Sequence, residues 1–132
     1  MALLGDDILG LGTDLVEIAR LAKSIERTGK AFLEKVYAPA ELEVAPEKDP
    51  RRMEFLAGRW AAKEALAKAL GTGITEKCRL QEICVLNDPS GRPVMTLSGS
   101  ARESADALGV RRILLSISHE HLYATATVLL TR

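Results

Sequence analysis

The sequence has no net charge, only two cysteines and no long apolar run. Acidic and basic residues balance at 18 each, so no overall positive field would attract nucleic acid or an anionic membrane. The apolar runs are much shorter than the roughly 20 residues that cross a bilayer. Residues 1–7 carry acids, whereas a secretory signal peptide begins with basic residues. These absences predict a cytoplasmic protein that binds neither nucleic acid nor membranes.

Cys78 and Cys84 are too few and too loosely spaced for a disulfide framework or a zinc knuckle. Cys84 lies in an apolar run, where a reduced thiol packs as a small hydrophobic side chain. We expect both thiols to be inert. A dinucleotide-binding fingerprint is missing too, because Gly10 and Gly12 are not followed by a third glycine at the start of a helix.

A chain of 132 residues has about the size of one domain, so we expect a single domain over residues 1–132. Hydrophobic periodicity and turn residues predict its elements. Strands are expected at residues 8–14, 81–86, 93–97, 111–118 and 123–130, and helices at residues 15–36 with a break at 28–29, from 39, at 52–70 and at 98–108. This order predicts an α+β fold in which one mostly antiparallel sheet packs on the long helix.

The long helix at residues 52–70 contains no proline and is rich in alanine, leucine and lysine. Gly71 and Gly73 follow it and end it. Its expected buried arc consists of Met53, Leu56, Trp60, Ala67 and Leu70, widened by Phe55 and Leu66. A second stripe contains Ala57, Ala61, Glu64 and Lys68. Its two small residues would leave room for a ligand beside an acid and a base one turn apart.

Glu64 and Lys68 are therefore the first candidates for chemistry. A glutamate followed by a lysine four residues later is also a common solvated helix pair, which contributes ~0.2–0.5 kcal/mol. The spacing alone favours the surface pair.

Asp14 follows the first predicted strand and has two interpretations. With Glu17 it matches a capping box at the start of a helix from Leu15. Alternatively, Gly10 and Gly12 let another group approach the backbone closely and present the Asp14 carboxylate to a cation. The local sequence favours the cap.

Two further features could bind charged ligands. Basic residues concentrate in the first helical region, at Arg20, Lys23, Arg27, Lys30 and Lys35, and either receive an acidic partner or form a solvated face. His119 follows a strand in a turn, where it is an ordinary surface residue, a phosphate contact or a proton relay. A metal site at His119 and His121 lacks a third nearby ligand.

Taken together, these motifs resemble one family. The sequence is similar to the 4′-phosphopantetheinyl transferases of the short holo-[acyl-carrier-protein] synthase type over about residues 8–128. The motifs are Gly12-Thr13-Asp14, Arg59-Trp60-Ala61-Ala62-Lys63-Glu64-Ala65-Leu66-Ala67-Lys68, Gly71-Thr72-Gly73-Ile74, Gly91-Arg92-Pro93 and Ser116-Ile117-Ser118-His119. Their order in a chain of this size is far more specific than any one of them.

The resemblance implies transfer of 4′-phosphopantetheine from coenzyme A to a serine of apo acyl carrier protein, with release of adenosine 3′,5′-bisphosphate. Asp14 and Glu64 would hold Mg²⁺, and Glu64 would also direct deprotonation of the serine. Lys68 would stabilise or protonate the diphosphate oxygens. Arg59 and Lys63 would contact coenzyme A phosphates.

The same resemblance implies a homotrimer with active sites between subunits. His119 would come from the neighbouring subunit and contact the region of the coenzyme A 3′-phosphate. The acidic carrier protein would dock on Arg20, which matches the family pattern directly, and on Arg27, Lys30 and Lys35, which match it loosely. A non-catalytic carrier-binding module would keep this basic face without needing Asp14, Glu64 and Lys68 together, and a nucleotide-phosphate hydrolase would use the same metal pair.

Overall fold

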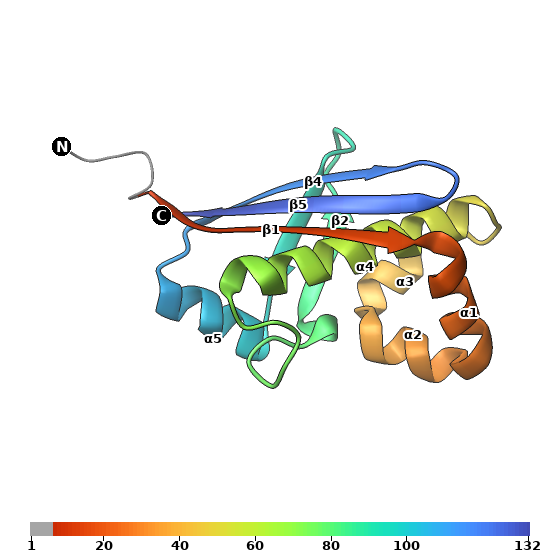
Figure 1. Cartoon of the computed structure of the whole chain (residues 1–132), viewed down its shortest axis with the longest axis horizontal. Coiled ribbons are helices and arrows are strands. Elements are labelled where there is room, and N and C mark those ends of the chain that lie inside the picture. Colours follow the sequence, from red (N-terminus) through yellow and green to blue (C-terminus); the bar gives the residue numbers. More distant parts are fainter. Residues whose placement is uncertain (1–6) are drawn as a thin grey trace.

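Helix α4 (Arg51–Leu70) runs through the middle of the computed structural model, which describes residues 7–132, and the other elements are arranged around it (Figure 1). The helix has the predicted extent and ends at Gly71, whose φ of 81° is left-handed. The remaining elements, in chain order, are β1 (Ile8–Glu17), α1 (Ile18–Thr28), α2 (Lys30–Val36), α3 (Pro39–Val44), a short 3₁₀ helix (Leu80–Glu82), β2 (Ile83–Asn87), β3 (Pro93–Leu97), α5 (Gly99–Leu108), β4 (Arg112–His119) and β5 (Tyr123–Thr131).

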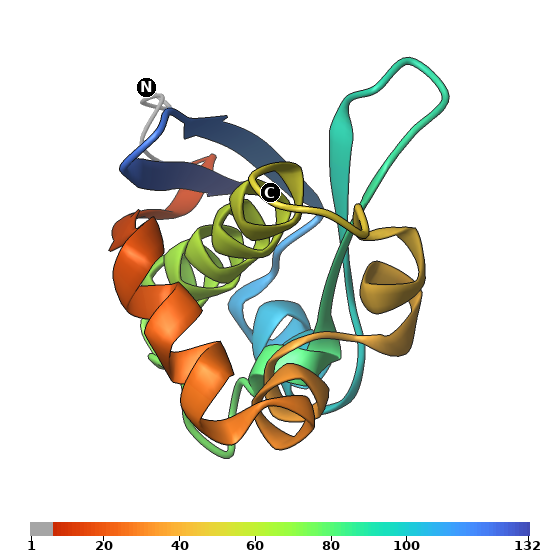
Figure 2. The same ribbon diagram turned by 90° about the vertical axis from the view of Figure 1, so that its right-hand side faces the viewer.

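The strands form two antiparallel sheets, which confirms the α+β class. A three-stranded sheet with the order β1-β5-β4 covers one side of α4, and the hairpin β2-β3 covers another side (Figure 2). The prediction of one sheet was wrong in this respect. Helix α4 buries residues on most of its circumference, so it needs apolar cover on more than one side.

The small residues of α4 allow the β1-β5-β4 sheet to pack closely on the helix, and they do not line a ligand site. Ala57 and Ala61 are completely buried, so the prediction that this stripe leaves room for a ligand was wrong at these two positions. A Cβ atom on Gly10 would lie 2.0 Å from the carbonyl oxygen of Ala69, and one on Gly12 would lie 2.0 Å from that of Ala65. The predicted close approach at the two glycines is therefore confirmed, and the group that approaches is the backbone of α4.

Strand β1 continues to Glu17, beyond its predicted end. Leu15 pairs with Thr125 and Val16 with Ala124 of β5, so helix α1 begins only at Ile18. The prediction of Asp14 as a helix cap was wrong, because pairing with β5 overrides the local capping pattern. The predicted break between two helices is confirmed at Gly29, which has a φ of 54°.

Within residues 7–132, no helix is both long and apolar enough to cross a membrane. The acidic stretch at residues 1–7 lies outside the described residues except for Asp7. Cys78 and Cys84 are free thiols, and burial raises the pKa of Cys78 to about 11, as expected for an inert thiol.

Candidate active site

Asp14 and Lys68 form an ion pair at the open side of the β1–α4 contact. The side chain of Asp14 is on the face of β1 that packs against α4, and Lys68 reaches it from the last turns of the helix. Lys68 Nζ lies 3.0 Å from Asp14 Oδ1 and also donates a hydrogen bond to the carbonyl oxygen of Thr13 at 3.0 Å. The side chain of Lys68 is 53% exposed, so its ammonium group is accessible to a ligand.

Glu64 lies one turn before Lys68 and brings a second carboxylate into this charge cluster. Burial raises the pKa of Glu64, the negative charge of Asp14 raises it further, and Lys68 lowers it. Two carboxylates that repel each other are stabilised by a cation between them. The structure therefore brings together all three residues that the sequence motifs predict for catalysis.

The donor set of Asp14 and Glu64 fits Mg²⁺. Within the described part of the chain, no group of three or more His, Cys, Asp or Glu side chains could hold a metal ion. Mg²⁺ is commonly bound by one or two carboxylates and fills its remaining positions with water and phosphate oxygens. A site with only two carboxylates is therefore suited to an ion that binds together with a phosphorylated substrate.

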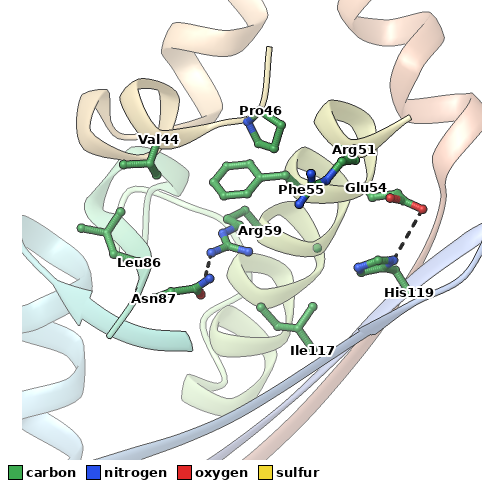
Figure 3. A pocket seen from close by; sticks show the side chains of 11 residues that line it. Val44, Pro46, Arg51, Glu54, Phe55, Arg59, Leu86, Asn87, Ile117 and His119 are labelled. Carbon is green, nitrogen blue, oxygen red and sulfur yellow. Dashed lines mark hydrogen bonds and ion pairs between the residues drawn. The ribbon is translucent and has the colours of Figure 1, made fainter. Parts of the chain in front are cut away.

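A pocket of about 660 Å³ lies on another side of α4, between the helix, the end of β4 and strand β2 (Figure 3). Helix α4 supplies residues at positions i, i+3, i+4, i+7 and i+8, which form one face of a helix. The lining residues are Val44, Pro46, Arg51, Glu54, Phe55, Gly58, Arg59, Leu86, Asn87, Ile117 and His119. The pocket combines an aromatic ring with two arginines and a histidine.

Arg59 is held in place on the wall of this pocket. Its Nε donates to the carbonyl oxygen of Val85 at 3.3 Å, and its Nη2 donates to Asn87 Oδ1 at 3.1 Å. The ring of Phe55 covers the guanidinium group, with its centroid 4.0 Å from Cζ. Burial lowers the pKa of Arg59. The sequence motifs predict Arg59 and His119 at phosphates of one ligand, and the structure places both at one pocket.

Lys63 does not reach either site. Its side chain is completely buried, with Nζ 2.6 Å from Glu41 Oε1 and 3.1 Å from the carbonyl oxygen of Leu80. It also donates to the carbonyl oxygen of Ile83. Burial lowers the pKa of Lys63, and Glu41 opposes this shift. The expected contact with coenzyme A phosphates does not fit this position, because the ammonium group is already satisfied inside the core.

The carboxylate pair and the pocket face different directions. Five residues separate Arg59 from Glu64, which corresponds to a rise of roughly 7.5 Å and a rotation of roughly 140° around the helix. The Asp14 cluster is next to β1, whereas Arg59 contacts β2. A single chain therefore presents two separate clusters of polar side chains on one helix.

The basic residues of the first helices are exposed. Arg20 lies on α1 and lines a groove of about 260 Å³ together with Trp60 and the end of β1. Lys30 on α2 forms a surface pair with Glu34 at 3.6 Å. Arg20 is therefore exposed beside the end of β1, the strand that carries Asp14.

Sequence reasoning missed four residues of the pocket: Arg51, Glu54, Phe55 and Asn87. The first three share the helix face of Arg59, so their spacing could have indicated them. Asn87 comes from the hairpin β2-β3, and no sequence pattern shows that this strand contacts Arg59.

Known proteins have the same fold and a similar sequence. Residues 10–126 match the family described as the 4′-phosphopantetheinyl transferase superfamily. A holo-[acyl-carrier-protein] synthase of Photobacterium profundum is 45% identical over 123 residues, which cover 93% of this chain and 97% of the relative. The solved structure of holo-[acyl-carrier-protein] synthase from Neisseria meningitidis has a TM-score of 0.87 at 33% identity and covers 95% of this chain and 99% of its own.

A second similar solved structure is a complex with a ligand. It is the holo-[acyl-carrier-protein] synthase of Helicobacter pylori in complex with coenzyme A, with a TM-score of 0.81, 33% identity, and coverage of 92% of this chain and 99% of that one. The matches extend over nearly the whole chain, and the fold agrees with them. The chain belongs to the 4′-phosphopantetheinyl transferase superfamily and, within it, to the holo-[acyl-carrier-protein] synthase type.

Proposed function

We propose that this enzyme transfers 4′-phosphopantetheine from coenzyme A to a serine hydroxyl of an apo acyl carrier protein. The proposal depends mainly on one observation: Asp14, Glu64 and Lys68 form a charge cluster of two acids and one accessible base. In the reaction, the serine oxygen forms a bond to the phosphorus that carries the pantetheine arm. The bond from this phosphorus to the other phosphate breaks, and adenosine 3′,5′-bisphosphate leaves.

The side chains of the cluster have separate roles in this proposal. Mg²⁺ held by Asp14 and Glu64 would neutralise charge on the diphosphate. Glu64 accepts the serine proton directly or through a water molecule. Lys68 stabilises the departing phosphate by donating a hydrogen bond or a proton to its oxygen.

The pocket beside α4 is the proposed site for the nucleotide end of coenzyme A. Arg51, Arg59 and His119 offer donors for phosphate, and Phe55 and Pro46 offer an apolar surface for a base. Two hydrogen bonds and the ring of Phe55 already hold the side chain of Arg59, so it loses little conformational freedom when it binds a phosphate. Lys63 is left out of the ligand site.

We further propose a homotrimer in which the Asp14 cluster of one subunit and the His119 pocket of its neighbour each form one half-site of a shared active site. The outer face of the β1-β5-β4 sheet has an apolar row in which Leu11 pairs with Leu129 and Leu129 pairs with Leu114. Leu11 is 65% exposed and Leu114 42% exposed, and the burial of such a surface favours association. Assembly through this face would bring the Asp14 half-site of one subunit to the His119 half-site of the next.

A mixing experiment tests this arrangement. An Asp14→Asn protein and a His119→Ala protein are each expected to be impaired, and subunit exchange should create some interfaces with both residues intact. Partial recovery of transfer supports sites between subunits. If mixed trimers form but stay as inactive as either parent, the two residues act within one subunit.

The proposed carrier surface is the basic face of α1 and α2 around Arg20. Carrier proteins of acidic surface charge would be attracted to this face by partly exposed charges.

The free thiols of Cys78 and Cys84 agree with a reducing compartment, so we place the reaction in the cytoplasm.

Mass spectrometry of apo carrier proteins after incubation with coenzyme A and Mg²⁺ tests the function itself. We expect a mass gain of one phosphopantetheine on the carrier with the native enzyme and none with Asp14→Asn. Release of bisphosphate without any carrier would instead identify a hydrolase. No modification and no release would overturn the proposal.

A further inference from the structure

Glu54 lies at the rim of the large pocket and faces His119. Its Oε2 is 3.7 Å from His119 Nδ1, and a dashed line joins the two side chains in Figure 3. The glutamate comes from the first turns of α4 and the histidine from the last residue of β4. Within the described residues, no other ion pair or side-chain hydrogen bond of either residue was found.

Close packing of the α4 backbone against β4 keeps these two elements near each other. A Cβ atom on Gly58 would lie 3.0 Å from Cγ2 of Ile117, so a larger residue there would press against β4 two residues before His119. The glycine therefore sets the distance between α4 and the end of the strand. Glu54, one turn earlier on the same helix face, then meets the imidazole.

His119 needs such a partner because its side chain is 47% exposed at the end of a strand. A half-exposed ring that rotates freely loses conformational freedom when a ligand immobilises it. A carboxylate next to Nδ1 fixes the ring and leaves Nε2 directed away from Glu54, where the doubly protonated ring donates from Nε2 to an anionic ligand.

We propose that Glu54 is a positioning residue that holds His119 ready for the 3′-phosphate of coenzyme A. This inference depends on the proposed function, since it assumes that the pocket takes the nucleotide end of coenzyme A. Glu54 itself touches no phosphate, because two negative groups in contact would repel each other.

Two simpler roles of Glu54 give different expectations. If the carboxylate only adds negative charge to the pocket, its removal should strengthen the binding of an anionic ligand. If it only interacts with the positive end of the α4 dipole, any acid at this position should suffice.

The test compares Glu54→Gln and Glu54→Asp with the native enzyme, each with and without His119→Ala. The glutamine removes the charge, and the aspartate keeps it but is one methylene too short to reach His119. We expect both to raise the KM for coenzyme A about three- to tenfold with an unchanged kcat. In the His119→Ala background, we expect neither to change the KM further.

A second substrate sharpens the result. Coenzyme A without its 3′-phosphate, dephospho-coenzyme A, should show the same KM with the native enzyme and with Glu54→Gln. Glu47→Gln serves as the matched control, because Glu47 is an exposed acid in the loop next to the pocket wall at Pro46 and should leave all constants at native values.

Three results would overturn the role of Glu54: a lowered KM in Glu54→Gln, a native KM in Glu54→Asp, or an effect that persists without His119. Lack of transfer by the native enzyme would overturn the proposed function separately. Calorimetry with adenosine 3′,5′-bisphosphate would then still decide the role of Glu54, because it measures binding without turnover.

Discussion

Helix α4 carries two lysine–carboxylate pairs that differ in their surroundings. Lys63 and Glu41 lie 2.6 Å apart, and neither side chain has any exposed surface. Lys68 and Asp14 lie 3.0 Å apart, with side chains that are 53% and 15% exposed. The lysines are five positions apart on the same helix and belong to the same sequence motif.

The difference shows why only one pair can take part in chemistry. Lys63 and Glu41 also bind backbone groups of four other residues, so the charges are fully satisfied and a ligand has no access. Lys68 keeps free donors in water, and Asp14 has a second carboxylate beside it. A ligand can therefore exchange partners in the exposed pair at little cost.

The largest effect is expected from Asp14→Asn. The substitution keeps the shape and one hydrogen bond to Lys68 but removes the negative charge that a cation requires. Transfer should fall on the order of a thousandfold, while the free energy of unfolding changes by less than about 1 kcal/mol. Steady-state kinetics and thermal unfolding measure both. Near-normal turnover at saturating Mg²⁺ would contradict the proposed metal role.

Lys63→Ala should have the next largest effect, on stability. It leaves Glu41 as an unpaired charge in the core, which costs roughly 3–5 kcal/mol. For a domain of this size, the melting temperature should fall by roughly 10–20 °C. Lys68→Ala is the matched control and should cost less than about 1 kcal/mol. Equal losses in the two variants would erase the distinction between the pairs.

Lys68→Ala should affect turnover instead of folding. Its ammonium group is proposed to stabilise charge that develops as the phosphate leaves, so kcat and kcat/KM should fall together by about a hundredfold. Kinetics at varied concentrations of carrier and coenzyme A separate these constants. A raised KM with native kcat would place Lys68 in substrate binding alone.

The smallest effect is expected from Arg20→Ala. Exposed charges on α1 steer an acidic partner, so the KM for the carrier should rise several-fold while kcat stays near the native value. Added NaCl should lower kcat/KM more steeply in the native enzyme than in Arg20→Ala, which has already lost one steering charge. Identical salt responses would move the docking surface elsewhere.

The sequence predicted the order of elements and the three residues of the charge cluster. It did so because α4 has a strong helical composition and ends at a glycine in the left-handed conformation, and because the motifs keep a fixed order. The order of elements depends on such local signals, which do not require knowledge of which elements come together in the fold. The charge cluster came from the family resemblance, because the local patterns favoured a cap at Asp14 and a surface pair at Glu64 and Lys68.

The predictions from sequence were wrong where contacts between distant parts of the chain determine the local structure. Asp14 has a good local capping pattern, but pairing of residues 15–17 with β5 gives more hydrogen bonds than a cap would. Lys63 looks like a surface lysine, and only the arrival of Glu41 from α3 makes its burial possible. The partners of Arg59 on β2 likewise come from a distant part of the chain.

The contact between β1 and α4 also limits how this enzyme can vary. At Gly10 and Gly12, a methyl group would collide with main-chain oxygens at 2.0 Å, and a main chain cannot rotate aside as a neighbouring side chain can. A survey of single substitutions should therefore find these two glycines as intolerant as the acids, although they offer no functional group. Substitutions can change the pocket one side chain at a time. The distance between β1 and α4, which sets the position of Asp14, can change only if both elements move together.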